Sequence, residues 1–587
     1  MSHQMIQRLE SAPRPDMYRE RWISLNGEWQ FAFDDADAGL DGGWFEPGRT
    51  FNRRIQVPFC YQSKRSGIGE TDLHEVVWYR KSVIVPRLEA HEHVYIHFGA
   101  VDYKADVWID GRHVGQHVGG HTGFSVKVPK ASADNGVFEI VVRAEDRYAV
   151  GQPRGKQIWG RHPERCWYTA TTGIWRRVWL EITGETRVER VRITPDVDRH
   201  EALVEGRLSR PAENGELAWT LHFNGAKISA GTLSVAGQHF RFAVPVEERD
   251  PIDIAAHLWS PQKPNLFFLE LELALNGRAE DRMLTYFGMR KIQTRGDRVL
   301  LNDVPLYQKL VLDQGYWPDT LMTPPDDGAL LKDVLLAKQM GFNGVRKHQK
   351  IEDPKYLFYA DVHGLLVWHE MPSMYRFSAE SMQALVQEWQ EAVEQAYNHP
   401  CVIVHVPLNE SWGVNDILNN EQQQRFAESL YHLTKALDPT RLVSTNDGWE
   451  MVTSDLCGVH DYEKSGDRLW EKFRDRDAVL AWQAQGKMLY ANGFGYRGEP
   501  VLLTEFGGIA LEDHSGESWG YNEKAADDEE LLARLANLLD AIRRLDYIQG
   551  YCYTQLTDVQ QEANGLLYAD RTPKVPLERV RELIERG

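Results

Sequence analysis

Several features that mark a function class are scarce or missing in this sequence. The chain has only 5 cysteines among 587 residues, widely spaced and without a Cys-x-x-Cys pair. This argues against a disulfide framework and against a zinc site. No apolar run reaches the roughly 18 residues of a membrane-spanning helix, and residues 1–16 lack the apolar core of a signal peptide. We therefore expect a soluble, cytoplasmic protein with no membrane partner.

Runs of basic residues are missing as well. The formal net charge is −19, and residues of both signs are interspersed along the chain. Without a basic stripe, nucleic acid is not an expected partner. The 42% of hydrophobic and 26% of charged residues are typical of a folded protein. A chain of 587 residues exceeds one hydrophobic core, so we expect roughly two to four domains.

The N-terminal part, residues 1–183, has the alternating polarity of β-strands. Aromatic residues alternate with polar ones between Trp29 and Phe33. An apolar run followed by Asp110-Gly111 predicts a tight hairpin. We predict an antiparallel β-sandwich of jelly-roll type.

Residues 184–288 continue with strands of alternating polarity. Asn-Gly pairs begin at Asn214, Asn224 and Asn276, and each predicts a tight turn. Short strands with frequent turns favour an immunoglobulin-like β-sandwich. Because this segment carries no catalytic constellation, we expect it to act as a spacer or brace.

From residue 289 to residue 587, short apolar runs alternate with amphipathic helical patterns, which is typical of βα units. One helical pattern places Leu385 and Trp389 on a single face, and another places Leu535 and Leu538 there. Such an alternation over about 300 residues predicts a (β/α)8 TIM barrel. The expected strands are Val304–Val311, Phe342–Arg346, Gly364–Trp368, Val402–Leu408, Arg441–Thr445, Leu456–His460, Pro500–Thr504 and Ile548–Tyr553.

Two of these strands end in a carboxylate. Glu410 follows the fourth expected strand, and Glu505 follows the seventh. A β/α barrel places its catalytic groups at the carboxyl ends of its strands. A lone glutamate there is more often structural, but two on matching strands favour chemistry. Glycoside hydrolysis requires such a pair, one to protonate the leaving oxygen and one to attack the anomeric carbon or activate water.

Short motifs spread over nearly the whole chain support the same chemistry. In chain order they are Leu25–Trp29, Gly173–Arg176, Phe287–Arg290, Gly344–His348, Leu366–Glu370, Asn398–Pro400 with Asn409-Glu410, and Thr504–Gly507. Together they resemble the motifs of glycoside hydrolase family 2, the group of β-galactosidases, β-glucuronidases and β-mannosidases. Their order and spacing make a chance match hard to credit.

The resemblance implies a retaining mechanism, with Glu505 as the nucleophile and Glu410 as the acid and then the base, their carboxyl groups about 5–5.5 Å apart. Arg346 and Tyr462 are the expected donors that keep Glu505 ionised. Asn409 is expected to hold the sugar's 2-hydroxyl. No cofactor is implied. Some family members bind Mg²⁺ or Na⁺, but this sequence places no metal site.

Further side chains are candidates for sugar contacts, and each is equally open to a supporting role. The candidates for hydroxyl binding are Asp313, His348, Glu370, Asn446, Asp447, His460 and Gln555. The candidates for an aromatic floor under the sugar are Trp368, Trp449 and Tyr553. Trp167 and Tyr168 of the N-terminal sandwich are candidates for reaching the site by analogy.

Substrate choice is less defined. The β-glucuronidases of this family carry an Asn-x-Lys element that grips the sugar carboxylate, whereas the corresponding stretch here, Glu562–Gly565, has no lysine. We therefore expect an exo-acting enzyme for a terminal neutral sugar, with a β-galactoside as the first choice by analogy. An arabinoside, galactofuranoside, glucuronide or mannoside stays open, as does a non-catalytic carbohydrate-binding protein. The expected partners are an oligosaccharide or glycoside and, because many relatives form one, a homo-oligomer.

Overall fold

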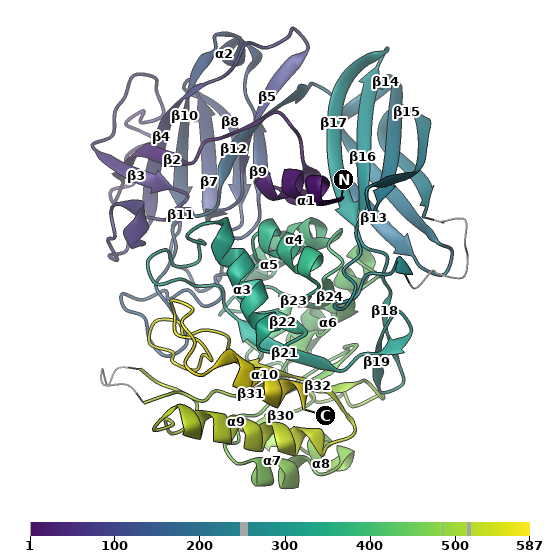
Figure 1. Ribbon diagram of the computed structural model, residues 1–587. Coiled ribbons are helices and arrows are strands. Elements are labelled where there is room, and N and C mark those ends of the chain that lie inside the picture. The colour runs from purple at the N-terminus through teal and green to yellow at the C-terminus, as the bar shows by residue number, and fades with distance from the viewer. Residues whose placement is uncertain (1, 247–255, 485, 513–517, 587) are drawn as a thin grey trace.

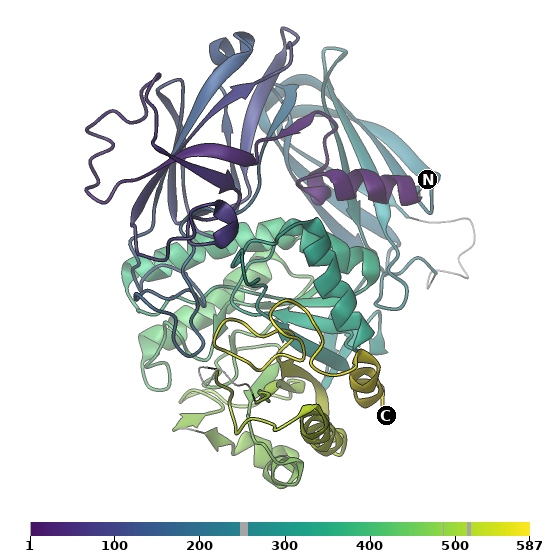
Figure 2. The same ribbon diagram turned by 60° about the vertical axis from the view of Figure 1, so that its left-hand side comes forward.

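The computed structural model of the chain describes residues 2–246, 256–484, 486–512 and 518–586. Two β-sandwiches lie side by side on one end of a barrel of strands and helices (Figure 1). The second view shows the same arrangement, with helix α1 (Ser2–Ser11) at the junction of the three parts (Figure 2). Met5 and Leu9 of α1 belong to the same hydrophobic cluster as the barrel interior. The first residues of the chain therefore tie the sandwiches to the barrel.

The N-terminal sandwich consists of two antiparallel sheets, and alternate side chains of each sheet point into one core. Trp29 and Phe31 of one sheet lie in the same cluster as Ile96 of the other. The predicted hairpin is confirmed, since Asp110 and Gly111 have φ values of +48° and +78° and connect two paired strands. One sheet has the order β3 (Arg53–Val57), β2 (Gly27–Phe33), β4 (Val76–Ile84), β10 (Val137–Glu145), β7 (Lys104–Ile109) and β8 (Arg112–Val118).

The second sheet of this sandwich is smaller, and short elements close the ends. Its order is β1 (Trp22–Ser24), β12 (Val178–Gly184), β5 (Glu92–Phe98) and β9 (Phe124–Lys127). The short elements are β6 (Val101–Asp102), which pairs with β11 (Gly173–Ile174), the helix α2 (Lys130–Asp134) and the 3-10 turn Lys64–Ser66. Another 3-10 turn, Pro15–Met17, precedes β1, and its Met17 lies in the core of the second sandwich. The chain between β10 and β11 leaves the sandwich and reaches the barrel.

The immunoglobulin-like part is built on one long, bent strand. Its strands are β13 (Val188–Asp196), β14 (Glu201–Phe223), β15 (Ala226–Pro245), β16 (Phe267–Leu275) and β17 (Arg278–Phe287), and β14 pairs with β13, β15 and β16. Asn224 and Asn276 form the predicted turns, with φ values of +48° and +51°. The turn predicted at Asn214 is wrong. That residue lies within β14 at a register shift, where a bulge bends the strand without reversing it.

Eight parallel strands form the barrel sheet. Its order is β26 (Leu442–Val443), β24 (Val402–Val406), β23 (Leu366–Glu370), β22 (Gly344–Lys347), β21 (Gln308–Asp313), β32 (Ile548–Thr554), β31 (Val501–Gly507) and β28 (Cys457–His460). Most of these strands are buried along their whole length, which explains their continuous apolar runs. Two further short strands, β25 (Leu408–Asn409) and β27 (Asn446–Asp447), pair with each other beyond β24 and β26.

Helices cover the outside of the barrel. They are α3 (Asp327–Gln339), α4 (Pro354–His363), α5 (Ala379–Ala396), α6 (Glu421–Leu437), α7 (Gly466–Phe473), α8 (Arg476–Leu480), α9 (Asp528–Arg543) and α10 (Leu577–Glu585). Both predicted amphipathic helices are confirmed, with Leu385 and Trp389 of α5 and Leu535 and Leu538 of α9 buried. Residues 448–456 join β27 to β28 without the expected helix.

The first and fifth expected strands differ from the structure. Val304 does not belong to the barrel. Asn302 and Asp303 have φ values of +54° and +63° and form a hairpin turn. Val304 therefore forms an antiparallel pair with Leu301. This separate sheet consists of β18 (Ile292–Arg295), β19 (Arg298–Leu301) and β20 (Val304–Pro305). The fifth strand is only two residues long, because the chain then turns to form β27 next to the fourth-strand extension.

A long connection of the N-terminal sandwich, residues 146–172, lies against the barrel, and we call it the bridging loop. The backbone N–H of Tyr375 donates to the carbonyl of Val150 over 2.8 Å, and that of Gly155 donates to the carbonyl of Ser373 over 3.0 Å. Gly155 has a φ of +59°, and a Cβ there would lie 2.4 Å from the carbonyl oxygen of Gln349. Only glycine allows this approach.

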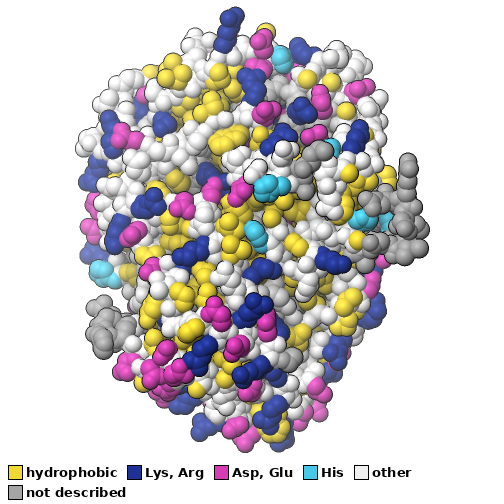
Figure 3. Space-filling view, viewed as in Figure 1, with side chains coloured by type: hydrophobic (Ala, Val, Ile, Leu, Met, Phe, Trp, Pro, Cys, Tyr) yellow, Lys and Arg dark blue, Asp and Glu magenta, His cyan; other side chains and the backbone are white. Residues whose placement is uncertain are grey.

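The surface agrees with the charge pattern of the sequence. Acidic and basic side chains intermingle over most of the face shown in Figure 3. Among the helices of the described residues, none combines the length and the apolar character needed to cross a bilayer.

Leu538 tests the packing of the barrel shell. Its side chain is 1% exposed beneath α9, so Leu538→Ala should lower the free energy of unfolding by about 2–5 kcal/mol through lost burial and a residual cavity. Urea denaturation followed by tryptophan fluorescence measures this loss. Asp540→Ala on the exposed side of the same helix is the matched control and should stay within about 0.5 kcal/mol. Equal losses for both variants would contradict the assigned helix face.

Candidate active site

The carboxyl ends of the barrel strands bring the two predicted glutamates together around one buried arginine. Arg346 on β22 donates from Nη1 to Glu505 Oε1 over 2.9 Å and from Nε to Glu370 Oε2 over 2.7 Å. Its Nη2 donates to Asn409 Oδ1 over 2.6 Å, and Nη1 lies 2.9 Å from Asp447 Oδ2. Burial would lower the pKa of Arg346, but the charges of Glu370, Asp447 and Glu505 raise it well above its ordinary value. The guanidinium is therefore a permanent charge in this site.

Glu505 on β31 is an ionised carboxylate. Tyr462 donates its hydroxyl to Glu505 Oε2 over 2.5 Å, while Arg346 holds the other oxygen. Burial would raise the pKa of Glu505, but the charges of His460 and Arg346 and the Tyr462 hydrogen bond hold it below its ordinary value. An anionic carboxylate with two fixed donors suits a nucleophile.

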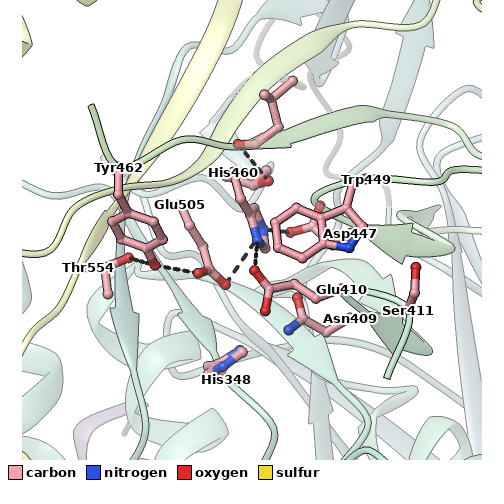
Figure 4. Close-up of polar contacts among 12 residues, drawn as sticks. His348, Asn409, Glu410, Ser411, Asp447, Trp449, His460, Tyr462, Glu505 and Thr554 are labelled. Atoms are coloured by element: carbon pink, nitrogen blue, oxygen red, sulfur yellow. Dashed lines mark hydrogen bonds and ion pairs between the residues drawn. The ribbon is translucent and has the colours of Figure 1, made fainter. Parts of the chain in front are cut away.

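His460 lies between the two glutamates (Figure 4). Its Nδ1 is 2.8 Å from Glu410 Oε1, and its Nε2 is 3.0 Å from Asp447 Oδ2 and 3.5 Å from Glu505 Oε1. Burial opposes the charged imidazolium, but the charge of Glu505 and the hydrogen bonds to Asp447 and Glu410 raise the pKa of His460 to about 10. Both ring nitrogens are then donors, and His460 is a cation that joins three carboxylates.

Glu410 is presented by a strained turn. Glu410 and Ser411 have φ values of +52° and +61°, which is unusual for two successive residues with side chains. The turn is held because the N–H of Glu410 donates to the carbonyl of Asp447, and the N–H of Ser411 donates to Asn446 Oδ1 over 2.9 Å. The Ser411 hydroxyl donates to Glu450 over 2.6 Å. The Glu410 side chain is 16% exposed, against 4% for Glu505, so Glu410 is the glutamate nearer to solvent.

Several of the candidates for sugar contacts are engaged with other side chains of the protein. Asp313 forms an ion pair of 2.7 Å with Lys347, and Asn446 holds the Glu410 turn. Gln555 accepts a hydrogen bond of 2.6 Å from Gln314. Glu370 is fully buried behind Arg346. These residues maintain the position of groups nearer to the cavity.

Two of the three aromatic floor candidates lie in the core of the barrel. Trp368 is fully buried and donates its indole N–H to Gln308 over 2.8 Å. Tyr553 is also fully buried. Its ring lies so close to Gly507 that a Cβ on that residue would be 2.4 Å from the ring edge. Both placements argue against the predicted contact with a sugar, because no ring face is accessible. Trp449 is half-buried beside His460, with ring centroids 5.7 Å apart, and remains a candidate.

The bridging loop completes one wall of the site. The ring of Trp167 stacks on Trp412 with centroids 5.3 Å apart, and its indole donates to the Tyr375 hydroxyl over 3.0 Å. Tyr168 donates its hydroxyl to Glu562 over 2.5 Å. His348 also belongs to the site, with Nδ1 2.9 Å from Glu370 Oε1, and burial lowers its pKa well below the ordinary value.

Sequence reasoning missed Lys156 of the bridging loop, whose ammonium lies 4.9 Å from the Trp412 ring centroid. No motif marks this lysine. It lies in a loop of another domain, and only tertiary packing brings it to Trp412, within electrostatic reach of the glutamates.

The site does not suit a metal ion. Glu410, His460 and Glu505 offer ligand atoms within 4.8 Å of one another, a spacing that a cation could bridge. A histidine with a pKa of about 10 is protonated at neutral pH and has no lone pair to offer. The imidazolium already occupies the place of a cation, so these three groups form an ion-paired cluster.

Comparison with known proteins agrees with this geometry. Three sequence models match: the sugar binding domain of glycosyl hydrolases family 2 over residues 22–181, glycosyl hydrolases family 2 over residues 186–290, and the TIM barrel domain of the same family over residues 325–586. Together they account for most of the chain.

Individual relatives are distant, and some of them span nearly the full length. A beta-glucuronidase of Streptococcus agalactiae is 24% identical over 568 residues, covering 87% of this chain and 88% of the relative. A beta-galactosidase of Thermoanaerobacter pseudethanolicus is 25% identical, covering 71% and 53%. Among solved structures, an uncultured Clostridium sp. beta-glucuronidase (TM-score 0.76, 19% identity) covers 97% of this chain and 99% of its own. A beta-galacturonidase of Eisenbergiella tayi (TM-score 0.72, 21% identity) covers 97% and 98%.

The charged state of His460 has a measurable effect on stability. The folded-state pKa of about 10 exceeds the ordinary value of 6.5, so the stabilisation from His460 is complete below pH 6.5 and is lost as the pH rises through about 10. The difference in unfolding free energy between wild type and His460→Gln should therefore be constant below pH 6.5 and shrink between pH 6.5 and 10. Urea unfolding across this range measures it. A difference that stays constant to pH 10 would mean that folding does not raise the pKa of His460.

Proposed function

The chain belongs to glycoside hydrolase family 2, and from that premise we propose that this glycosyl hydrolase is a retaining, exo-acting enzyme that releases a terminal β-linked hexuronic acid. The observation that carries the retaining course is the distance between the two carboxylates. Oxygens of Glu410 and Glu505 lie within 4.8 Å of each other. Retaining enzymes have carboxyl groups about 5–5.5 Å apart, whereas inverting enzymes leave about 6.5–9.5 Å for a water.

In the first step, Glu505 attacks the anomeric carbon while the bond from that carbon to the leaving oxygen breaks. Glu505 is ionised and fixed by Arg346 and Tyr462, so its lone pair has a defined direction. Glu410 delivers a proton to the leaving oxygen. This proton comes from the pair of Glu410 and His460, in which Glu410 Oε1 and His460 Nδ1 lie 2.8 Å apart.

In the second step, water attacks the glycosyl–Glu505 ester from the side that the aglycone has left. Glu410 now accepts a proton from this water, and the ester bond breaks to return Glu505 to its anionic form. Each step inverts the anomeric carbon, so the product keeps the configuration of the substrate.

Asn409 is placed to bind the sugar's 2-hydroxyl. Arg346 holds its carbonyl oxygen, which fixes the amide orientation. Its Nδ2 is buried and has no hydrogen-bond partner among the described residues. A buried donor without a partner costs free energy, and a hydroxyl of the substrate would satisfy it in the transition state.

The names of the relatives favour a uronic acid over the neutral sugar that the sequence led us to expect. The beta-glucuronidase of Streptococcus agalactiae and the solved beta-glucuronidase and beta-galacturonidase all act, by name, on uronic acids. A neutral β-galactoside, the first expectation from sequence, is supported by fewer of these names, such as the Thermoanaerobacter beta-galactosidase. The exo mode is supported by the bridging loop, because the contact of Tyr168 with Glu562 closes one side of the barrel mouth.

The nucleophile is tested with Glu505→Ala and azide. The variant should lose activity by roughly 10⁴–10⁶-fold on a panel of nitrophenyl glycosides. Added azide should restore turnover and give a glycosyl azide of the anomeric configuration opposite to that of the substrate. Because the panel includes β-glucuronides, β-galacturonides and β-galactosides, wild-type rates also identify the sugar. A variant that keeps the wild-type rate would overturn the assignment of Glu505.

The acid is tested by the leaving group. Glu410→Ala should lower kcat/KM by about 10²–10⁴-fold for a glycoside of a poor leaving group such as methanol. The loss should be much smaller in the first step for a dinitrophenyl glycoside, whose leaving oxygen needs no proton. Azide should here give a product that retains the substrate's configuration. A loss independent of the leaving group would contradict general acid catalysis by Glu410.

A further inference from the structure

Lys156 is held at the active site by a rigid part of the bridging loop. Its carbonyl accepts a hydrogen bond of 2.7 Å from the N–H of Tyr168, and the preceding Gly155 is fixed against the barrel by Ser373. The side chain is only 6% exposed. A side chain held in this way has lost most of its freedom before any ligand arrives, so little further entropy is lost on binding.

Lys156 differs from the other buried lysines of the described residues. Those lysines all form ion pairs: Lys347 with Asp313 and Glu352, Lys350 with Glu352, Lys355 with Asp327, and Lys574 with Asp558. Lys156 forms none with any described carboxylate; its near neighbours are the Trp412 ring, at 4.9 Å, and the Cys166 thiol. Buried charges in proteins are normally paired. A buried ammonium without a carboxylate partner is a place for an anion.

The ammonium stays charged despite its burial. Desolvation would lower the pKa of Lys156, but the neighbouring Cys166 thiol and the charges of Glu562, Glu505 and Glu410 raise it above its ordinary value. The same interactions place the ammonium within electrostatic reach of both catalytic glutamates. Burial raises the pKa of the Cys166 thiol, which is therefore a neutral neighbour at physiological pH and no counter-ion.

Other cations near the glutamates are already engaged. Arg346 holds four acceptors, including Glu505. His460 joins Glu410 to Asp447 and Glu505. Burial and the charge of Lys156 lower the pKa of His348 well below its ordinary value, so that ring is neutral. An acidic sugar in this site would find its cation on Lys156.

We propose that Lys156 binds the carboxylate of the substrate's terminal hexuronic acid and thereby sets the preference for an acidic over a neutral sugar. The inference rests on the proposed function, because it names the group that recognises the proposed sugar. It also explains how the protein could bind a uronic acid, which the stretch Glu562–Gly565 by itself disfavours. That stretch lacks a lysine, but the cation comes from the N-terminal sandwich instead of the barrel. Trp412, two residues after Glu410, supports the ammonium through its ring face.

The test compares matched acidic and neutral substrates with Lys156→Met. The para-nitrophenyl β-glucuronide and β-galacturonide are each paired with the β-glucoside and β-galactoside, which differ only at C6. The variant should lose about 10²–10³-fold in kcat/KM on the acidic member, mainly through KM, and change less than about threefold on the neutral member. Lys127→Met, at a half-exposed lysine of the same sandwich paired with Glu185, is the matched control and should change neither.

The outcomes separate this inference from the proposed function. Suppose that wild type cleaves a uronide, and that Lys156→Met lowers kcat/KM equally on the acidic and neutral substrates or lowers it on neither. The role of Lys156 is then overturned while the proposed function stands. If wild type cleaves a neutral glycoside and no uronide, the proposed sugar is overturned and the inference falls with it. Thermal unfolding of each variant shows whether it is folded, and Lys156→Gln is a second variant without the charge.

A measurement on the wild type alone does not depend on any variant. Free glucuronate or galacturonate should inhibit competitively at a concentration at least about tenfold lower than glucose or galactose. Added salt should weaken the inhibition by the acids and leave the neutral sugars unaffected, since the contact is an ion pair. Equal inhibition by acids and neutral sugars would overturn the proposal.

Discussion

The buried guanidinium of Arg346 is the constraint on which the active site depends. It rises from β22 and reaches Glu370 on β23, Asn409 on β25, Asp447 on β27 and Glu505 on β31. A planar group with donors in fixed directions imposes one geometry on all four partners. Each carboxylate is buried only because the arginine compensates its charge. The guanidinium thus sets where the nucleophile lies and turns the amide of Asn409 so that its N–H₂ is available to a sugar.

The charges around Arg346 are distributed unevenly, and this gives the two glutamates different tasks. Glu505 has two direct donors, which favour the anion despite its burial. Glu410 lies on a strained turn nearer to solvent and contacts the His460 imidazolium. The histidine lowers the energy of the anionic nucleophile and places a proton next to the acid. In the proposed mechanism, one cation between two carboxylates therefore serves both halves of a double displacement.

The domain arrangement is part of the site as well. The N-terminal sandwich extends its bridging loop across the barrel mouth, and the close contact at Gly155 allows no side chain between the two. Trp167, Tyr168 and Lys156 thereby become part of a site whose catalytic groups all come from the barrel. Loops of a neighbouring domain can change without disturbing the barrel strands, so this arrangement lets the substrate preference vary while the chemistry is conserved in place.

The sequence by itself determined the three architectures and the two glutamates. Apolar runs, alternation and turn pairs are local signals, and strand ends in a barrel converge whatever the loops do. The domain limits at residues 183 and 288 and the roles of the site residues remain predictions.

Local patterns could not show that the Asn214 pair forms a bulge, because strand pairing on both sides outweighs turn propensity. Nor could they place Trp368 in the core, since a strand-end tryptophan looks the same in either setting. Only the tertiary structure decided that Lys156, more than two hundred residues from Glu410 in the chain, lies within electrostatic reach of Glu410 and Glu505. Electrostatic contacts between domains depend on distance in space, and no spacing along the chain encodes it.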